Sequence, residues 1–449
     1  MKKLLPFFCV IGLFFFLASP AFAGGAVNKT NWSVEYIRTL NRNAATDAAD
    51  AALYNPAGTV TMEDGFYGNI SAHYIKKDYA NNMNFGANAV VGAFGQDRES
   101  DEPSVIPGIF AVYKKKDWSI FGAISNHGGG GAVDFSQGDL TTRKLGYGMW
   151  GLALNPLTAP IFGGAGPGPI SNEKIEGESH YIGYNLGVAY RINKIFAVSA
   201  ALKYIDAKRD ADITASVTNL AGTFTEDASY EEDAVGMGGV FGLNISPSAD
   251  LNIGLRYETN VDLTFKQEVG KDSLGLLPFL GPSLGVTDGG RVRKDLPAIG
   301  ALGVSYRFLQ KFRVEANLTY YFNENAHNDD WLRTQAEVDD GYDLGIMLEY
   351  TFNDKLLATL GYLYTEVGMR PEDMTPEAPE LEAQTIGAGV AWKLMQDLTL
   401  NFAIGNSFYT SESFTYNGPA ALAALGINDR VEYQKNNMFV GFGVEYKFF

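Results

Sequence analysis

The sequence has little of what most protein chemistry depends on. It contains one cysteine, Cys9, and four histidines in 449 residues. A chain with a single thiol forms no internal disulfide, and the scattered histidines show no metal-ligand spacing. Beyond the N-terminal segment, no stretch approaches the roughly 18 consecutive apolar residues of a membrane-spanning helix. These absences exclude a disulfide scaffold and a helical membrane protein.

The N-terminus has the pattern of a secretory signal peptide, residues 1–23. Lys2 and Lys3 precede an apolar run, 4–17, and Ala21-Phe22-Ala23 gives a small-x-small cleavage pattern. Removal of this segment takes Cys9 with it and leaves 33 basic and 52 acidic residues, a net charge of −19. Such a balance argues against nucleic acid as a partner, because phosphates require a basic surface.

The exported chain alternates between apolar and polar residues. Successive side chains of a strand point to opposite faces, and in 342–352 one face is apolar throughout while the other is polar or small. The apolar residues of this example are Tyr342, Leu344, Ile346, Leu348, Tyr350 and Phe352. A chain whose outer face is apolar and whose inner face is polar is typical of a barrel surrounded by lipid.

Fourteen such strands are predicted, an even number that an antiparallel barrel requires. They are 66–76, 105–114, 117–125, 181–191, 196–208, 235–245, 251–266, 297–308, 313–323, 341–352, 356–366, 385–394, 398–408 and 438–448. Short turns alternate with long loops at 77–104, 126–180, 209–234, 267–296, 324–340, 367–384 and 409–437. We therefore expect an all-β fold, a 14-stranded antiparallel transmembrane β-barrel formed by 66–449 in the outer membrane of a Gram-negative bacterium. The alternative is a soluble periplasmic or extracellular β-protein.

Residues 24–65 precede the first strand and form a separate unit, which we call the hatch. Apolar residues recur at helical spacing after Ser33, a plausible helix cap, and Asn55-Pro56-Ala57-Gly58 indicates a defined turn. A barrel of this size is too wide for its own side chains to fill. We expect the hatch to be a small, partly helical plug inside the lumen. A periplasmic tail is the alternative, although the segment is apolar for a disordered chain.

The sequence resembles the FadL-type outer-membrane transporters of long-chain fatty acids and other hydrophobic compounds. The resemblance is most specific in the hatch, at Arg38-Thr39-Leu40-Asn41-Arg42-Asn43-Ala44 and in the run into Asn55-Pro56-Ala57-Gly58. Weaker motifs follow in the expected order at 246–257, 296–298 and 361–364. The last strand, with alternating apolar residues to Phe448, resembles the assembly signal of such barrels, except that Phe449 is out of phase. The resemblance covers the whole mature chain and implies fourteen strands and an N-terminal hatch.

The resemblance also implies a lateral gate. In this family the Asn-Pro-Ala turn touches an inward kink in the third strand, and the ligand leaves sideways into the membrane. Glycines after the third strand permit such a bend, although they suit the start of a flexible loop equally well. The residues carried over are Asn55, Pro56 and Ala57 in the hatch and Asn126, His127, Gly128 and Gly129 after the third strand.

Two of the long loops carry apolar residues that loops normally avoid, which often marks a binding site. We expect them to capture substrate in a groove between the loops. The alternative is that the two loops pack on each other and cap the barrel. The residues are Leu274, Leu276, Leu277, Phe279 and Leu280 in 267–296, and Trp150 and Phe162 in 126–180.

Cations in the lumen are candidates for contact with the carboxylate of an acidic ligand. Lys203, Arg256 and Arg307 lie on the polar face of their strands, and Arg38 lies in the hatch. Buried charges need partners, so we expect most of them to be paired with carboxylates of the lumen.

Enzyme motifs are absent. The sequence has no G-x-S-x-G elbow, and a hydrolase in a barrel wall needs a serine beside a histidine and an orienting group. His73 and His127 instead occupy lumen or loop positions, and His180 only opens a strand. We expect no catalytic residue, no cofactor and no metal site.

The sequence favours passive uptake of hydrophobic compounds, such as long-chain fatty acids, with capture on the loops and lateral release at the third strand. A greasy molecule gains about 0.8 kcal/mol per methylene on leaving water, so an oily path needs no energy source. A general diffusion porin for polar solutes and a surface adhesin on a barrel anchor are the alternatives. We expect a monomer whose partners are the hydrophobic ligand and outer-membrane lipid.

Overall fold

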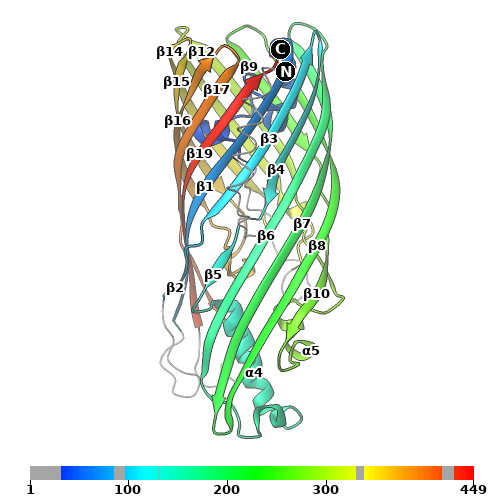
Figure 1. Ribbon diagram of the computed structural model, residues 1–449, viewed down its shortest axis with the longest axis vertical. Coiled ribbons are helices and arrows are strands. Elements are labelled where there is room, and N and C mark those ends of the chain that lie inside the picture. The colour runs from blue at the N-terminus through cyan, green and yellow to red at the C-terminus, as the bar shows by residue number, and fades with distance from the viewer. Residues whose placement is uncertain (1–31, 85–96, 130, 330–337, 417–428) are drawn as a thin grey trace.

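The computed structural model describes residues 32–84, 97–129, 131–329, 338–416 and 429–449. The predicted signal peptide, 1–23, lies outside these residues. The described chain is an elongated barrel with one end extended by strands and short helices (Figure 1). Among the described residues, no helix combines the length and apolar character of a membrane-spanning helix.

Fourteen antiparallel strands form the wall, as predicted. Each strand pairs with the next, and β1 pairs with β19 from Tyr67↔Lys447 to Asn84↔Arg430, which closes the barrel. The strands are β1 (Gly65–Asn84), β3 (Ser104–Lys115), β4 (Trp118–Gly128), β6 (Ile170–Arg191), β7 (Phe196–Asn219), β8 (Gly222–Ile245), β9 (Leu251–Glu258), β12 (Ala298–Phe308), β13 (Phe312–Phe322), β14 (Gly341–Asn353), β15 (Leu356–Glu366), β16 (Ala383–Met395), β17 (Leu398–Tyr409) and β19 (Asp429–Lys447). The register of β19 accommodates Phe449 beyond the strand, where its side chain is exposed.

The long-loop end contains elements that the sequence did not predict. They are β2 (Asp97–Ser100), β5 (Val133–Phe135), α4 (Leu140–Leu154), η2 (Ala159–Phe162), β10 (Thr264–Asp272), α5 (Leu277–Leu280), η3 (Gly281–Leu284), β11 (Arg291–Arg293), η4 (Asn323–Asn325), η5 (Pro371–Asp373) and β18 (Glu412–Tyr416). The predicted strand 251–266 is divided into β9 and β10. Most of these elements extend the barrel beyond its wall (Figure 1).

The prediction of a loop at 209–234 was wrong. These residues continue β7 and β8 as a paired hairpin as far as Asn219↔Gly222. The alternation persists but with the polarity of the faces exchanged: Ile205 and Ile213 are buried on the inner face, while Lys208 and Asp210 lie on the outer one. The exchange occurs beyond the paired residues Tyr184 and Tyr204. A prediction that looks for an apolar outer face therefore ends its strands at the row of Tyr184 and Tyr204.

Between that row and the short-turn end, the wall has the apolar outer face and polar inner face that lipid requires. Leu186 and Leu202 are 67% and 77% exposed on the outer face. The inner face is polar, and its buried residues include Asn69, Ser71, His73, Asn185, Lys203, Arg256, Glu315, Asn317, Glu349 and Asn401. The apolar exterior and polar interior confirm the interpretation of the period-2 pattern.

The hatch lies inside the barrel toward the short-turn end (Figure 1). Its described part contains α2 (Val34–Thr39), α3 (Ala51–Tyr54) and η1 (Pro56–Thr61). Ser33 caps α2, since its Oγ accepts a hydrogen bond from the backbone N–H of Tyr36 at 2.9 Å. Leu40 ends the helix in the left-handed conformation.

The hatch backbone lies directly against glycines of the wall. A Cβ on Gly361 would lie 2.0 Å from the carbonyl oxygen of Thr39, and one on Gly254 would lie 2.0 Å from that of Asn43. A Cβ on Gly387 would lie 2.3 Å from the carbonyl oxygen of Ile37. We call Gly254, Gly303, Gly345, Gly361 and Gly387 the glycine seat. No side chain fits between the hatch and the wall at these positions.

We predict that Gly361→Leu displaces the hatch and leaves the barrel intact. The new side chain meets backbone, which has little freedom to move aside, and a barrel of this width without its plug holds an aqueous channel. Conductance in planar bilayers should rise from near zero to that of an open pore, with unchanged heat-modifiable mobility on gels. Gly300→Leu is the control, because its Cβ meets nothing closer than 3.6 Å. Equal conductance of the two variants would contradict the prediction.

Candidate functional site

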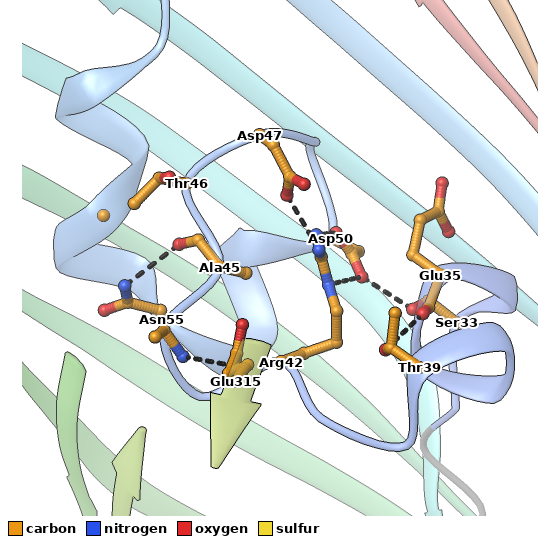
Figure 2. A network of polar contacts seen from close by, with 12 residues as sticks. Ser33, Glu35, Thr39, Arg42, Ala45, Thr46, Asp47, Asp50, Asn55 and Glu315 are labelled. Carbon is orange, nitrogen blue, oxygen red and sulfur yellow. Dashed lines mark hydrogen bonds and ion pairs between the residues drawn. The ribbon is translucent and has the colours of Figure 1, made fainter. Parts of the chain in front are cut away.

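A network of charges holds the hatch together. The Nε of Arg42 donates to Oδ2 of Asp50 at 3.0 Å, and its Nη1 donates to Oδ1 of Asp47 at 2.7 Å. Asp50 also accepts a hydrogen bond from the Ser33 hydroxyl at 2.7 Å. Figure 2 shows Arg42 pointing toward both aspartates. Because Arg42 and Asp50 are fully buried, removal of either partner leaves an uncompensated charge at high cost.

Hatch amides are bonded to polar side chains of the wall. The N–H of Ala44 donates to Glu315 at 3.1 Å, and the N–H of Asn43 donates to the Asn317 side chain at 2.9 Å. The N–H of Ala49 donates to Glu445 at 2.6 Å. These bonds satisfy hatch backbone groups that no helix or sheet pairs, so the lumen is built to receive this segment.

The predicted Asn-Pro-Ala turn lies at the short-turn end. Asn55 Nδ2 donates to the carbonyl of Ala45 at 2.9 Å and to Oδ1 of Asn244 at 2.7 Å. The Ala57 side chain lies 3.3 Å from the Cβ position of Gly242 on β8. Pro56 begins η1, which contacts β4 through a 2.7 Å bond between the hydroxyls of Thr59 and Ser119.

The structure separates the two halves of the predicted gate. Asn126, His127, Gly128 and Gly129 follow Ser119 by about seven residues along β4, a distance of roughly 23 Å in a strand. The Asn-Pro-Ala turn therefore contacts β8 and the other end of β4, and does not approach 126–129.

The wall itself separates near 126–129. Ladder pairing between β3 and β4 runs from Lys115↔Trp118 to Gly108↔Ser125 and ends there. Beyond this row, 104–107 of β3 pair with β1 alone, and β4 pairs with β6 alone through a bulge between Asn126 and Gly128. Pro107 has no N–H to offer the ladder. The two strands therefore diverge at this height.

Close packing on β6 shapes the end of β4. Asn126 Oδ1 accepts a hydrogen bond from the N–H of Tyr181 at 3.1 Å. A Cβ on Gly128 would lie 2.7 Å from the Tyr181 ring. Gly129 has φ of +75°, and a Cβ there would lie 2.4 Å from the carbonyl oxygen of Ser179. These glycines press the chain against β6 and away from β3.

A cavity of about 140 Å³ lies on the long-loop side of the hatch. The hatch contributes Trp32, Tyr36 and Tyr54, whose rings stack in series with centroids 5.9 Å and 5.2 Å apart. His127 of β4 also lines the cavity. The cavity therefore has an aromatic floor and reaches the strand on one side of the β3–β4 separation.

Lys203 and Arg256 line this cavity, and both are paired with Glu258. Lys203 Nζ forms an ion pair with Glu258 Oε2, and Arg256 Nε lies 2.9 Å from Oε1. Arg256 also donates to the carbonyl oxygens of Leu53 and Tyr54 in the hatch, at 3.0 Å and 2.6 Å. These contacts agree with the expectation that buried lumen cations have carboxylate partners.

The other two predicted cations lie elsewhere. Arg38 donates to Asn401 at 3.2 Å and lies 3.8 Å from Glu349, within the contact between hatch and wall. Arg307 is exposed at the end of β12, where its N–H bonds the carbonyl of Asp250 in a short turn. Neither lines the cavity.

The predicted capture residues are mostly buried. Trp150 and Phe162 pack in one apolar cluster with Leu276 and Leu280, and Leu274 is partly buried against it. A Cβ on Gly148 of α4 would lie 2.7 Å from a Leu280 methyl group. Leu277 is also buried, and Phe279 is 56% exposed. In this conformation the two loops pack on each other, as the alternative expectation described.

Comparison with known proteins identifies the family. The family described as outer membrane protein transport protein (OMPP1/FadL/TodX) matches residues 171–448, more than half of the chain. The chain belongs to this family. No curated protein matches the sequence. The family places the protein in the outer membrane of a Gram-negative bacterium, among transporters of hydrophobic compounds.

Solved structures share the fold at low sequence identity. A Pseudomonas aeruginosa FadL homologue has a TM-score of 0.67 and 15% identity, covering 95% of this chain and 100% of that one. The Pseudomonas putida toluene transporter TodX has a TM-score of 0.59 and 14% identity over 96% of this chain and all of its own. The Ralstonia pickettii toluene transporter TbuX has a TM-score of 0.58 and 15% identity, covering 94% of this chain and 100% of that one.

Some residues in and around the cavity were not predicted from the sequence. Asp343 and Tyr36 line it and were not singled out, and neither was Glu258, which pairs with the lining residues Lys203 and Arg256. A signal for Glu258 was present, because it follows Arg256 by two residues and therefore shares its inward face. No group of three or more potential metal ligands is found in the part of the chain that the structure describes.

Glu35 is a buried carboxylate of the hatch whose pKa is raised. Its carboxylate is fully buried and accepts hydrogen bonds from Asn69 and Asn401 at 2.7 Å and 2.8 Å. Burial, together with the nearby Asp50 carboxylate, raises the pKa of Glu35 to about 7.

The raised pKa makes hatch docking depend on pH. The unfolded carboxyl titrates near 4.5 and the docked one near 7, so the stability that Glu35 contributes is full below 4.5 and is lost as the pH rises through 7. We predict slower protease cleavage of the hatch at about pH 5 than at about pH 8. Glu35→Gln should flatten this dependence, whereas Glu63→Gln, at an exposed hatch position, should not. An unchanged pH profile in Glu35→Gln would refute the assignment.

Proposed function

We propose that the protein carries hydrophobic compounds across the outer membrane by passive transport and releases them sideways between β3 and β4. Candidate ligands are long-chain fatty acids, aromatic hydrocarbons and similar lipophiles. The observation that supports the proposal best is the loss of β3–β4 pairing beside a lumen cavity. The docked hatch blocks the direct route to the periplasm, so the wall offers the remaining exit.

The first step of the proposal is capture at the extracellular end. The apolar cluster of α4 and α5 holds Trp150, Phe162, Leu276 and Leu280. These side chains pack on each other, so a ligand can enter only when α5 moves away from α4. The ligand then replaces the contacts between the two helices. Phe279, exposed on α5, is the expected first contact.

The second step is passage through the cavity toward the wall. Ser125 and Ser71 face the lumen at the last β3–β4 row, on either side of Gly108. The hydroxyls of both serines are buried and have no hydrogen-bond partner in the described chain. Small residues at this point leave room for a ligand. His127, two residues after Ser125 on β4, lines the cavity, so the row lies next to it.

The physical reason for a lateral exit is the hydrophobic effect. Each methylene gains about 0.8 kcal/mol on leaving water, and a water-filled channel to the periplasm would lose that gain. A path from one apolar environment to another keeps it, so the gradient of the ligand is sufficient to drive transport. We expect a single chain, surrounded by outer-membrane lipid, to provide the whole path.

Filling the β3–β4 separation tests the exit. We predict that Ser125→Trp reduces uptake of a labelled long-chain hydrocarbon to the level of cells without the protein, while Ser125→Ala transports normally. Both variants should keep the heat-modifiable mobility of the folded barrel. Normal uptake by the folded Ser125→Trp variant would exclude this exit. A large steady conductance of the unmodified protein in planar bilayers would instead support a porin.

Locking the capture loops tests the first step. The mature chain contains no cysteine, so Gly148→Cys with Leu280→Cys introduces one pair where the two helices touch. We predict that oxidation abolishes uptake and that a reductant restores it. Either single cysteine variant is the control. Uptake that is indifferent to oxidation of the pair would show that α4 and α5 need not separate.

A further inference from the structure

One carboxylate pairs with both cations that line the cavity in the described part of the chain. Lys203 occupies one oxygen of Glu258 and Arg256 the other. The Nη1 of Arg256 also donates to two carbonyl oxygens of the hatch. All three charged side chains are buried. A ligand carboxylate entering this cavity therefore has to compete with Glu258 for its cations.

The rest of the charged lining is acidic. Asp343, Glu366 and Glu380 line the same cavity. Asp343 accepts hydrogen bonds from the hydroxyls of Tyr321 and Thr365, at 2.6 Å and 2.7 Å. Glu366 accepts one from the Tyr364 hydroxyl at 2.8 Å. These three carboxylates outnumber the two cations that line the cavity in the described chain. Like charge raises the cost of a bound anion.

The uncharged part of the lining contains both polar groups and apolar side chains. The Nε2 of His127 is buried and has no hydrogen-bond partner in the described chain. A neutral imidazole nitrogen forms one hydrogen bond, as donor or acceptor, and a buried one without a partner is costly. A hydroxyl group of a ligand would supply that bond. The aromatic floor of Trp32, Tyr36 and Tyr54 suits the apolar part of the same molecule.

We propose that Glu258 makes the cavity selective for neutral amphiphiles. By pairing with Lys203 and Arg256, the two cations that line the cavity in the described chain, it makes an acid compete for them, so an alcohol or a phenol binds in preference to a carboxylate of the same length. This inference rests on the proposed transport function and narrows its ligand class. Glu258 is a specificity-determining residue, which acts through the two cations that it occupies.

The test uses a fluorescence signal from the cavity itself. Trp32 lines the cavity and is one of five tryptophans, so a variant that keeps it alone reports ligands that reach the floor. The probes are 10-bromodecanol and 10-bromodecanoate, whose bromine quenches indole. Binding is measured in nanodiscs at about pH 8, where the carboxylic acid is ionised.

We predict that the alcohol binds about tenfold more tightly than the carboxylate, a factor that corresponds to ~1.4 kcal/mol. Glu258→Gln releases both cations, so carboxylate binding should strengthen until the preference is lost or reversed, while alcohol binding changes little. Glu366→Gln, at the cavity rim and away from the triad, should shift the preference in the same direction by a smaller factor and guards against a folding defect. Glu268→Gln, on the outer face of β10, should change nothing.

Each result decides between the claims. Equal binding of the two probes, or an unchanged preference in folded Glu258→Gln, would overturn the role of Glu258 while leaving transport through the cavity intact. Quenching of Trp32 by neither probe would overturn the selectivity together with the proposed path. Cell uptake of a hydrocarbon without a head group tests transport separately, since it does not depend on Glu258.

Discussion

The direct contact between the hatch backbone and the glycine seat is the constraint on which the rest of the structure depends. Because no wall side chain stands between them, hatch carbonyls lie within van der Waals distance of several strands at once. Polar groups that this contact brings into the lumen must find partners there. Glu315, Asn317 and Glu445 supply them from the wall. The barrel is therefore shaped around a particular plug.

The position of the hatch also gives the cavity its chemistry. Tyr36 and Tyr54 reach the cavity because α2 and α3 are held against the wall on its short-turn side. Arg256 is bonded to both the hatch carbonyls and Glu258, so it links the plug to the charge balance of the cavity. A displacement of the hatch would alter the lining and the electrostatics together. The hatch and the cavity are thus linked through one arginine.

Much of the fold was predictable because lipid imposes a simple rule on every strand. The fourteen wall strands follow from a period of two and from the alternation of short and long connections. The hairpin of 209–234 was missed because its apolar face points inward to α4, as in a soluble protein. The local pattern shows that a strand exists there but does not state which solvent it faces.

The site was less predictable than the fold, since it depends on which inward residues meet. Lys203 and Arg256 were found from their phase, but their common partner Glu258 lies on one strand with Arg256 and across β8 from Lys203. The Asn-Pro-Ala turn and residues 126–129 are far apart for a similar reason: η1, which begins at Pro56, contacts one end of β4, and 126–128 form the other end. The distance between two residues on one strand follows from the rise per residue. The partners of the hatch depend instead on how all the strands of the barrel are placed.

The exchange of polarity at Tyr184 and Tyr204 has a consequence for how the protein sits in its membrane. A shift of the barrel outward would bring Leu202 into the headgroup layer, and a shift inward would bring Asp206 and Lys208 into hydrocarbon. Both displacements are opposed, so this row marks the outer boundary of the bilayer. The β3–β4 separation is thereby held at a fixed depth relative to the lipid that surrounds it.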